Sequence, residues 1–173
     1  KIRLHGVNSP FEEFAISETL NQLGTHAVYV RAIYATGSAK LERSIDPRRY
    51  ESHKEILDND GNPVLGEDHN YITIRGYYNG PDEWVSKNEG ALYTPVDLVK
   101  AVRKKIIDET QSRKFLEKVV ARLREAGYDG SLLKANDLLL AVDAKGGIMK
   151  GKSGEPDVII CNFEVIWKVA GPA

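Results

Sequence analysis

Residues 129–164 read DGSLLKANDLLLAVDAKGGIMKGKSGEPDVIICNFE and contain the longest uninterrupted apolar run of the chain, Leu138–Val142. A glycine- and lysine-rich loop, residues 143–154, follows this run and leads into a second apolar segment, residues 157–161. Short apolar runs bounded by turn residues are typical of buried strands. The pattern therefore predicts two strands joined by a hairpin, preceded by a helix that ends at Gly127.

The first part of the chain predicts a strand, a helix and another strand. Residues 1–5 alternate polar and apolar side chains, which favours a short strand. The sequence Ser-Pro-Phe-Glu at residues 9–12 combines an N-cap serine, a proline at the first helical position and capping-box spacing. The helix is expected to end at Gly24, and residues 27–35 are rich in β-branched and aromatic side chains, which predicts a strand.

The middle of the chain has a less regular pattern. Residues 37–70 have little apolar period, which indicates an insertion with a short helix near residues 49–57 and a hairpin. Another strand is expected at Tyr71–Arg75, followed by one helix over residues 94–108 and a second over about residues 112–126. Because the strands bracket the helices and do not alternate with them, the fold class is expected to be α+β.

Composition narrows the function classes. The 173 residues are 42% hydrophobic and 28% charged, with a net charge of -1, which argues against binding nucleic acid mainly through bulk positive charge. No apolar run approaches the ~20 residues that a membrane helix needs. The single cysteine, Cys161, excludes an internal disulfide framework and a multi-cysteine zinc site. A cytoplasmic protein with neither nucleic acid nor membrane as partner is expected.

Three groups of residues carry candidate chemistry, each with a simpler interpretation beside it. Lys1 and either Glu12 or Glu13 could form an ion pair across a strand–helix contact, and such a lysine can also hold phosphates. Both side chains could equally be solvated surface charges. Asn136, at the end of the loop before the apolar strand, could ligate a metal or simply fix the turn.

The third group is Asn162-Phe163-Glu164, directly after the second apolar segment. An amide and a carboxylate that leave a buried strand can point into a cleft, or they can be ordinary turn residues. Residues 146–153 match the phosphate-loop pattern G-x-x-x-x-G-K-S, but a strand follows where such a loop requires a helix, which favours a hairpin tip.

The second and third groups together resemble the catalytic half of the protein-kinase-like fold, including its small-molecule phosphotransferases. In that family a helix leads into a loop with a catalytic aspartate, and an asparagine follows five residues later. A strand, a hairpin, another strand and a metal-binding Asp-Phe-Gly come next. Residues 129–140 look like this loop, with Asn136 at the metal-binding asparagine and Asn162-Phe163-Glu164 at the Asp-Phe-Gly position.

The resemblance also implies a two-lobed organisation. Lys1 resembles the lysine of the small lobe's strand and Glu13 the glutamate of its helix. The resemblance implies a partial small lobe over residues 1–76, with one helix packed on a sheet and the insertion at residues 37–70. Residues 77–173 would form a mainly helical second lobe. The family's glycine-rich phosphate loop would lie upstream of Lys1.

Several family residues are replaced in this chain. Ser131 stands at the catalytic aspartate, and a serine hydroxyl is a poor proton acceptor near neutral pH. Asn162 stands at the metal-binding aspartate, and a neutral amide binds Mg²⁺ more weakly than a carboxylate does. Glu164 replaces the glycine, which could move the carboxylate ligand by two positions. Asp129 or Asp137 could replace the lost base, although both are out of register.

These changes predict a kinase-like domain with weakened catalytic residues. It would act as a nucleotide-binding or regulatory module of the pseudokinase type, with an unknown protein or small molecule as partner. Two alternatives stay open. One is an active ATP- and Mg²⁺-dependent phosphotransferase that uses Asn136, Asn162 and Glu164 for metal and Asp129 as base. The other is a non-catalytic interaction domain of an unrelated α+β fold.

Overall fold

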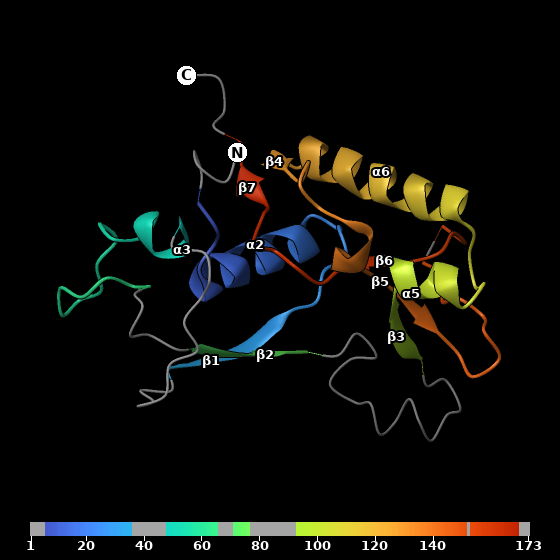
Figure 1. Ribbon diagram of the computed structural model, residues 1–173, viewed down its shortest axis with the longest axis horizontal. Coiled ribbons are helices and arrows are strands. Elements are labelled where there is room, and N and C mark those ends of the chain that lie inside the picture. Colours follow the sequence, from blue (N-terminus) through green and yellow to red (C-terminus); the bar gives the residue numbers. More distant parts are fainter. Residues whose placement is uncertain (1–5, 36–47, 66–70, 77–92, 152, 170–173) are drawn as a thin grey trace.

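The computed structural model describes five segments of the chain, residues 6–35, 48–65, 71–76, 93–151 and 153–169. They form helices and small antiparallel sheets, which confirms the α+β class (Figure 1). Lys1 and the first predicted strand lie outside the described residues. The division of the chain into two lobes near residue 76 stays a prediction.

Helix α2 (Pro10–Gln22) begins where the capping box predicts. The Glu12 N–H donates to Ser9 Oγ at 3.3 Å, and the Ser9 N–H donates to Glu12 Oε2 at 2.7 Å. These bonds satisfy N–H groups that the first turn of a helix leaves without partners. Gly24 follows the helix with φ +77°, a left-handed conformation that glycine adopts without steric cost. Local sequence therefore sets both ends of α2.

A buried histidine holds the segment after helix α3 (Arg48–Glu51) against the start of α2. The His53 side chain is 3% exposed, and its Nε2 lies 2.5 Å from Glu12 Oε2. Burial alone would raise the pKa of the Glu12 carboxyl, but hydrogen bonds from Ser9 and His53 hold it below its usual value. A lowered pKa means that this carboxylate stabilises the fold above the pKa of unfolded glutamate, and that the stabilisation is lost as the pH falls.

The insertion contains less helix than its sequence predicts. The helix expected near residues 49–57 ends at Glu51, and a turn closes through the Asp58 carboxylate, which accepts two backbone N–H groups at 2.9 Å. Leu57 and Pro63 form an isolated antiparallel bridge across this turn, which confirms the predicted hairpin. Aspartate at the start of a turn favours this local bonding over helix.

Strands β1 (Val30–Ala35) and β2 (Tyr71–Arg75) form an antiparallel pair. The bounds of β2 are those predicted, whereas β1 begins three residues later than expected. The residues just before β1 pair elsewhere, because the Val28 N–H donates to the Ile160 carbonyl at 2.9 Å. This short segment therefore ties the first half of the chain to the last strands.

The helix predicted over residues 94–108 is wrong at both ends, because only residues 98–103 are helical. Residues 94–97 form strand β3 (Thr94–Asp97), which pairs antiparallel with strand β5 (Leu138–Val142). Thr94 and Pro95 have the composition of a helix start, but the buried β5 needs hydrogen-bond partners on both sides. A proline is tolerated here because β3 lies at the edge of its sheet.

Two helices follow β3, and aspartates cap both. The Asp97 carboxylate accepts an N–H in the first turn of α5 (Leu98–Arg103). Asp108 and Gln111 form a reciprocal capping box at the start of α6 (Glu109–Glu125), with bonds of 2.7 and 2.9 Å. The capping box explains why α6 begins earlier than its apolar period predicts.

Strand β5 lies at the centre of a sheet with the order β3–β5–β6, and β6 (Val158–Ile160) is its antiparallel neighbour. The register pairs Leu138 with Ile160, so the start of β5 lies beside the end of β6. The described residues of the glycine-rich segment 146–153 lie in the hairpin between these strands, with no helix after them. The hairpin prediction is therefore confirmed.

One buried core extends from α2 to the end of the described chain. Leu20 of α2, Ile160 of β6 and Phe163 are fully buried in the same cluster. Strands β4 (Tyr128–Asp129) and β7 (Trp167–Lys168) pair antiparallel, and they bring the end of the described chain back to the residues after α6. The core therefore fixes where β6 ends relative to α2.

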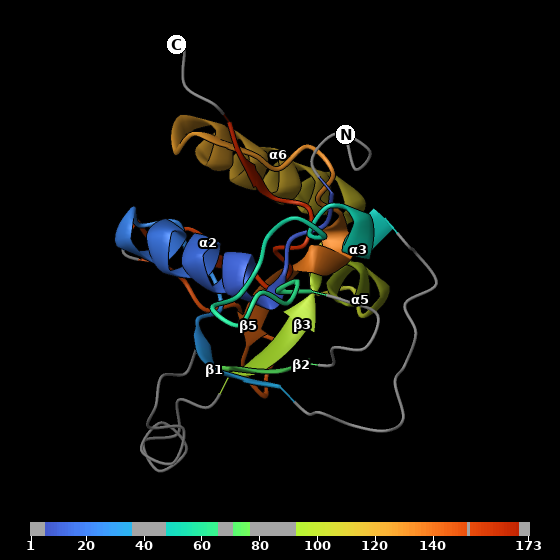
Figure 2. The ribbon, with the colours of Figure 1, turned by 90° about the vertical axis from the view of Figure 1, so that its left-hand side faces the viewer.

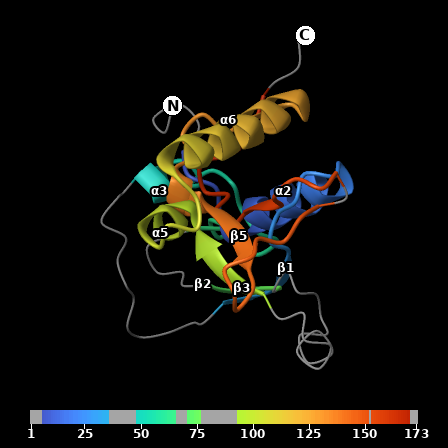
Figure 3. The ribbon, with the colours of Figure 1, turned by 90° about the vertical axis from the view of Figure 1, so that its right-hand side faces the viewer.

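Figures 1, 2 and 3 show the arrangement of these elements from three sides. Helix α6 lies at one end of the molecule and the β1–β2 pair at the opposite end, with α2 and the strands β3, β5 and β6 between them. None of the helices in the described part of the chain combines the length and apolarity needed to cross a bilayer.

Candidate functional site

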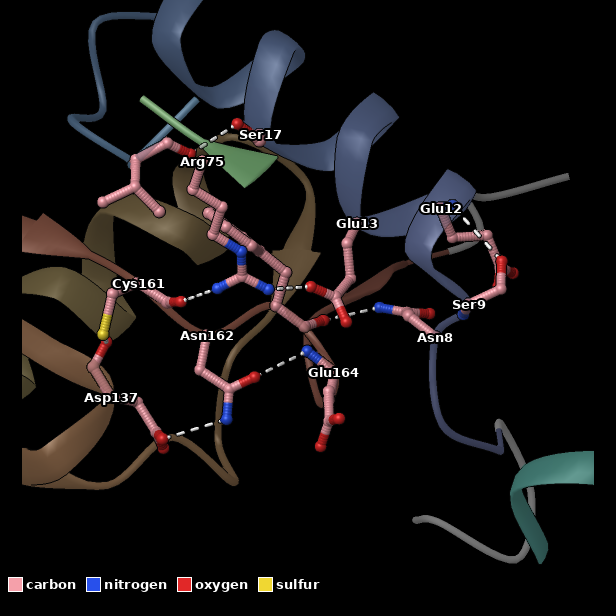
Figure 4. Close-up of polar contacts among 12 residues, drawn as sticks. Asn8, Ser9, Glu12, Glu13, Ser17, Arg75, Asp137, Cys161, Asn162 and Glu164 are labelled. Atoms are coloured by element: carbon pink, nitrogen blue, oxygen red, sulfur yellow. Dashed lines mark hydrogen bonds and ion pairs between the residues drawn. The ribbon is translucent and has the colours of Figure 1, made fainter. Parts of the chain in front are cut away.

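The residues just after β6 meet four other segments of the chain, and we call this meeting point the Asn162 cluster (Figure 4). Its members come from the residues before α2, from α2 itself, from the end of β2, from the loop before β5 and from the chain after β6: they are Asn8, Glu13, Arg75, Asp137, Cys161, Asn162 and Glu164. Polar groups from distant parts of the sequence converge here because the antiparallel hairpin and α2 share one core.

Arg75 links α2 to the end of β6. Its guanidinium forms an ion pair with the Glu13 carboxylate and donates to the Cys161 carbonyl. It also lies over the Phe163 ring, with 5.6 Å between the guanidinium carbon and the ring centre. Glu13 is only 6% exposed, and a buried carboxylate is costly unless it is paired. Glu13 therefore forms an ion pair with Arg75, which the sequence did not indicate, and the predicted pair with Lys1 stays a prediction because Lys1 lies outside the described residues.

Asp137 and Asn162 contact each other through their side chains. The Asn162 Nδ2 donates to Asp137 Oδ1 at 3.0 Å, and the Asn162 Oδ1 accepts the Glu164 N–H at 3.1 Å. The other Asp137 oxygen accepts the Lys134 N–H at 2.8 Å. The Glu164 N–H needs an acceptor and the buried Asp137 carboxylate needs a donor, so these neighbours fix the orientation of the Asn162 amide.

This arrangement suits a hydrogen bond better than a divalent cation. Mg²⁺ prefers several oxygen ligands, with carboxylates among them. The Asn162 amide turns its N–H, not its oxygen, toward Asp137. Within the segments that the structure describes, no group of three or more His, Cys, Asp or Glu side chains could hold a metal ion. These residues therefore fit poorly to the Mg²⁺ that the kinase resemblance implies.

Asn136, the predicted metal ligand, lies beside the residue that Asn162 contacts. Its side chain is exposed, whereas Asp137 is 6% exposed and carries the contact. Residues 135–137 form a 3₁₀ turn, in which successive side chains point about 120° apart. The sequence did contain a signal for Asp137, because an antiparallel hairpin brings the residue before its first strand next to the residues after its second.

Ser131 and Asp129, the predicted catalytic positions, lie in a local turn after α6. The Asp129 carboxylate accepts the Ser131 N–H at 2.9 Å, and Asp129 itself belongs to strand β4. Aspartate commonly bonds the backbone N–H two residues ahead in such turns. The described contacts give these two residues a structural role, and the proposed base function of Asp129 stays a prediction.

Glu164 joins the cluster through its backbone. Its N–H donates to Asn162, and its carbonyl accepts the Asn8 N–H at 3.0 Å. The Asn8 side chain also bonds this segment, because its Nδ2 donates to the carbonyls of Phe163 and Ile166 at 2.7 and 2.6 Å. Asn8 is 7% exposed and was not identified from the sequence. Asn8 therefore fixes the chain after β6 to the residues before α2.

Replacing Asn8 with alanine is expected to lower the free energy of unfolding by about 2 kcal/mol, because the carbonyls of Phe163 and Ile166 each lose one hydrogen bond, and the Phe163 carbonyl keeps a second one from the Ile166 N–H. Urea denaturation followed by circular dichroism measures the change. Asn62→Ala is the matched control, since Asn62 is exposed in a turn, and a change below about 0.5 kcal/mol is expected there. Equal effects of the two substitutions would mean that Asn8 does not hold this segment.

The Cys161 side chain, in the Asn162 cluster, is half-buried and has the properties of a packed thiol. Burial, together with the nearby Asp137 charge, raises the pKa of Cys161 to about 11. The thiolate is the reactive form, so the thiol stays protonated and unreactive near neutral pH. This environment gives Cys161 a structural role.

Hydrogen bonds and the Arg75–Glu13 ion pair of this cluster connect α2 to the base of the hairpin. Comparisons of the chain with protein-family models, with curated proteins and with solved structures give no match. The function must therefore be argued from the residues of the chain.

Proposed function

We propose that this chain is a kinase-like domain that acts as a regulatory module of the pseudokinase type, with residual nucleotide affinity and without efficient phosphoryl transfer. The order of its elements supports the resemblance: a glutamate-bearing helix, two paired strands, two helices, and a hairpin with polar residues at its base. A function inferred from a fold resemblance is an analogy until a site supports it. The proposal is argued from the contacts of the Asn162 cluster.

The observation that carries the proposal is the bond from Asn162 to Asp137. In the family that the chain resembles, the positions before and after the two hairpin strands carry metal ligands. Here an amide N–H donates to the carboxylate at this place, 3.0 Å away. An amide donor satisfies a buried carboxylate as a cation would, but it supplies no Lewis acid to a phosphate. A domain built this way can keep its shape and its contacts without metal-dependent catalysis.

The arginine contact supports the same conclusion. Glu13 pairs with Arg75, which also bonds the carbonyl of Cys161 at the end of β6. This arrangement connects α2 directly to the hairpin. The position of α2 is therefore tied to the residues around Asn162, as expected of a module that responds to a bound partner.

The proposal predicts a nucleotide effect that does not depend on metal. Millimolar ATP is expected to raise the melting temperature by a few degrees, and by the same amount with Mg²⁺ or with EDTA. A ligand at ten times its Kd stabilises by about 1.4 kcal/mol, which is roughly 3–5 °C for a domain of this size. Differential scanning fluorimetry measures the shift, and inorganic triphosphate is the control for general anion binding.

Two results would contradict the proposal. If no nucleotide shifts the melting temperature under either condition, the residual nucleotide affinity is excluded. If ATP acts only together with Mg²⁺ and the protein transfers phosphate to a general acceptor such as casein, the chain is an active phosphotransferase with unusual ligands.

A further inference from the structure

A groove beside the hairpin of β5 and β6 contains none of the residues of the Asn162 cluster. It has a volume of about 590 Å³ and lies between α6 and the chain that leads into β6. Phe115 and Val119 of α6 form one apolar wall, and Pro156 and Val158 form the other. The turn after α2 closes one end at Gly24. A groove of this size can hold one or two side chains of a bound peptide.

Three cationic side chains of α6 line this groove at a spacing of four residues, namely Lys114, Lys118 and Arg122. Residues four apart lie on the same face of a helix. With a rise of 1.5 Å per residue, the first and the last are separated by about 12 Å along the helix axis. The groove therefore has a cation near each end and another at its middle.

The middle cation already has a partner in the opposite wall. Lys118 forms an ion pair with Glu155, and this contact, together with the nearby Arg122 charge, holds the pKa of the Glu155 carboxyl below its usual value. The second carboxylate of that wall, Asp157, lies 2.7 Å from His26 Nδ1. Both carboxylates of the groove thus have a side-chain partner among the residues that line it.

The groove has three cationic side chains against two carboxylates, so positive charge is in excess. Neither Lys114 nor Arg122 forms an ion pair with any residue that the structure describes. Lys114 and Arg122 flank the apolar walls, in which Val119 is 3% exposed and Val158 is 9% exposed. An occupant that matches this surface carries two negative charges about 12 Å apart and an apolar group between them.

We propose that this groove binds an extended acidic segment of a partner protein, with the pattern acidic-x-apolar-x-acidic. In an extended chain the side chains at i, i+2 and i+4 lie on one face, and four residues span about 13 Å. The first acidic side chain then meets Lys114, the apolar side chain enters between Phe115 and Pro156, and the last acidic side chain meets Arg122.

The walls of the groove favour this occupant over a polyanion. Glu155 and Asp157 would face the phosphates of a nucleic acid or polyphosphate at close range, whereas an extended peptide can keep its two charges at the ends. The apolar walls would also desolvate a phosphate without offering it a hydrogen bond. The groove would be the partner surface of the proposed regulatory module, and its residues are separate from those of the Asn162 cluster.

The test uses a fluorescein-labelled nonapeptide with the core Glu-Ser-Phe-Ser-Glu and measures fluorescence anisotropy with the full chain. Micromolar binding that weakens with added salt is expected. Replacing the peptide phenylalanine with serine, or both glutamates with lysine, is expected to weaken binding about tenfold or more. Heparin and a single-stranded oligonucleotide, tested in the same way, are expected to bind more weakly than the peptide.

Two double variants of α6 distinguish binding in the groove from a general effect of net charge. Lys114→Glu/Arg122→Glu is expected to weaken binding about tenfold or more, whereas Arg113→Glu/Arg124→Glu, with the same charge change outside the groove, is expected to change it by less than about twofold. Lys114→Gln/Arg122→Gln repeats the test with a smaller charge change, and circular dichroism verifies that each variant folds.

Three results would overturn the proposal: no binding of the peptide, equal losses in the two glutamate variants, or tighter binding of heparin or the oligonucleotide than of the peptide. Any of these leaves the ATP-dependent melting shift unaffected, since none of the groove residues belongs to the Asn162 cluster.

Discussion

Replacing Arg75 with methionine is expected to lower the free energy of unfolding by about 2–3 kcal/mol, because it removes a cation that pairs with the buried Glu13 carboxylate, while the Arg75 side chain itself is partly exposed. The substitution removes the cation that pairs with Glu13, the donor to the Cys161 carbonyl and the charge over the Phe163 ring. Methionine keeps much of the volume of the arginine stem, so the loss of packing is small. Most of the effect should therefore come from the polar contacts.

Chemical denaturation measures this change, and Arg31→Met is its control. Arg31 lies on the paired strand β1, is exposed, and contacts the Tyr29 ring at 5.8 Å, so a loss below about 1 kcal/mol is expected. A double-mutant cycle with Glu13→Gln isolates the pairwise contact, and a coupling of about 1–3 kcal/mol is expected. Equal losses for Arg75→Met and Arg31→Met would contradict the role of Arg75 as a link between α2 and β6.

Replacing Asn162 with aspartate is expected to cost about 3 kcal/mol at neutral pH without metal, because two carboxylates then face each other across about 3 Å. The loss should shrink as the pH falls, since one carboxyl of such a pair takes up a proton more readily than an isolated one. Millimolar Mn²⁺ or Mg²⁺ should recover part of the stability, because the pair then offers two carboxylates to a cation. The unaltered protein should show no such response to metal.

The matched control exchanges the two residues, as Asp137→Asn/Asn162→Asp. This variant keeps one amide and one carboxylate, and each new side chain can still accept its backbone N–H from Lys134 or Glu164. It should lose less than about 1 kcal/mol and show little response to Mn²⁺. If Asn162→Asp and the exchanged variant lose equal stability, or if Mn²⁺ does not distinguish them, the amide of Asn162 is not a substitute for a cation at this position.

Local rules predicted the parts of this fold that depend on neighbours in the sequence. The capping box of Ser9 and Glu12 and the strand at Tyr71–Arg75 have the predicted bounds. The hairpin of β5 and β6 follows from apolar runs of strand length around a turn-rich loop. These elements require no information from distant residues.

Other parts depended on contacts that no local pattern reports. Residues 94–97 look like a helix start but pair with β5, more than forty positions away in the sequence. Arg75 was visible only as the end of a strand, because its partner Glu13 lies on another element. The candidate pair of Asn136 and Asn162 was close to the observed contact, but the 3₁₀ turn presents Asp137 instead.

The backbone hydrogen bonds that join His26 and Val28 to Ile160 limit how the chain can be divided into fragments. The segment before β1 forms the outer neighbour of β6, with the Ile160 N–H also donating to the carbonyl of His26 at 3.0 Å. A fragment that starts after residue 92 would leave this side of β6 without partners, and an open strand edge of apolar residues promotes association with other chains. The parts of the chain before and after residue 92 are therefore expected to melt in a single cooperative transition, and neither part is suited to separate expression.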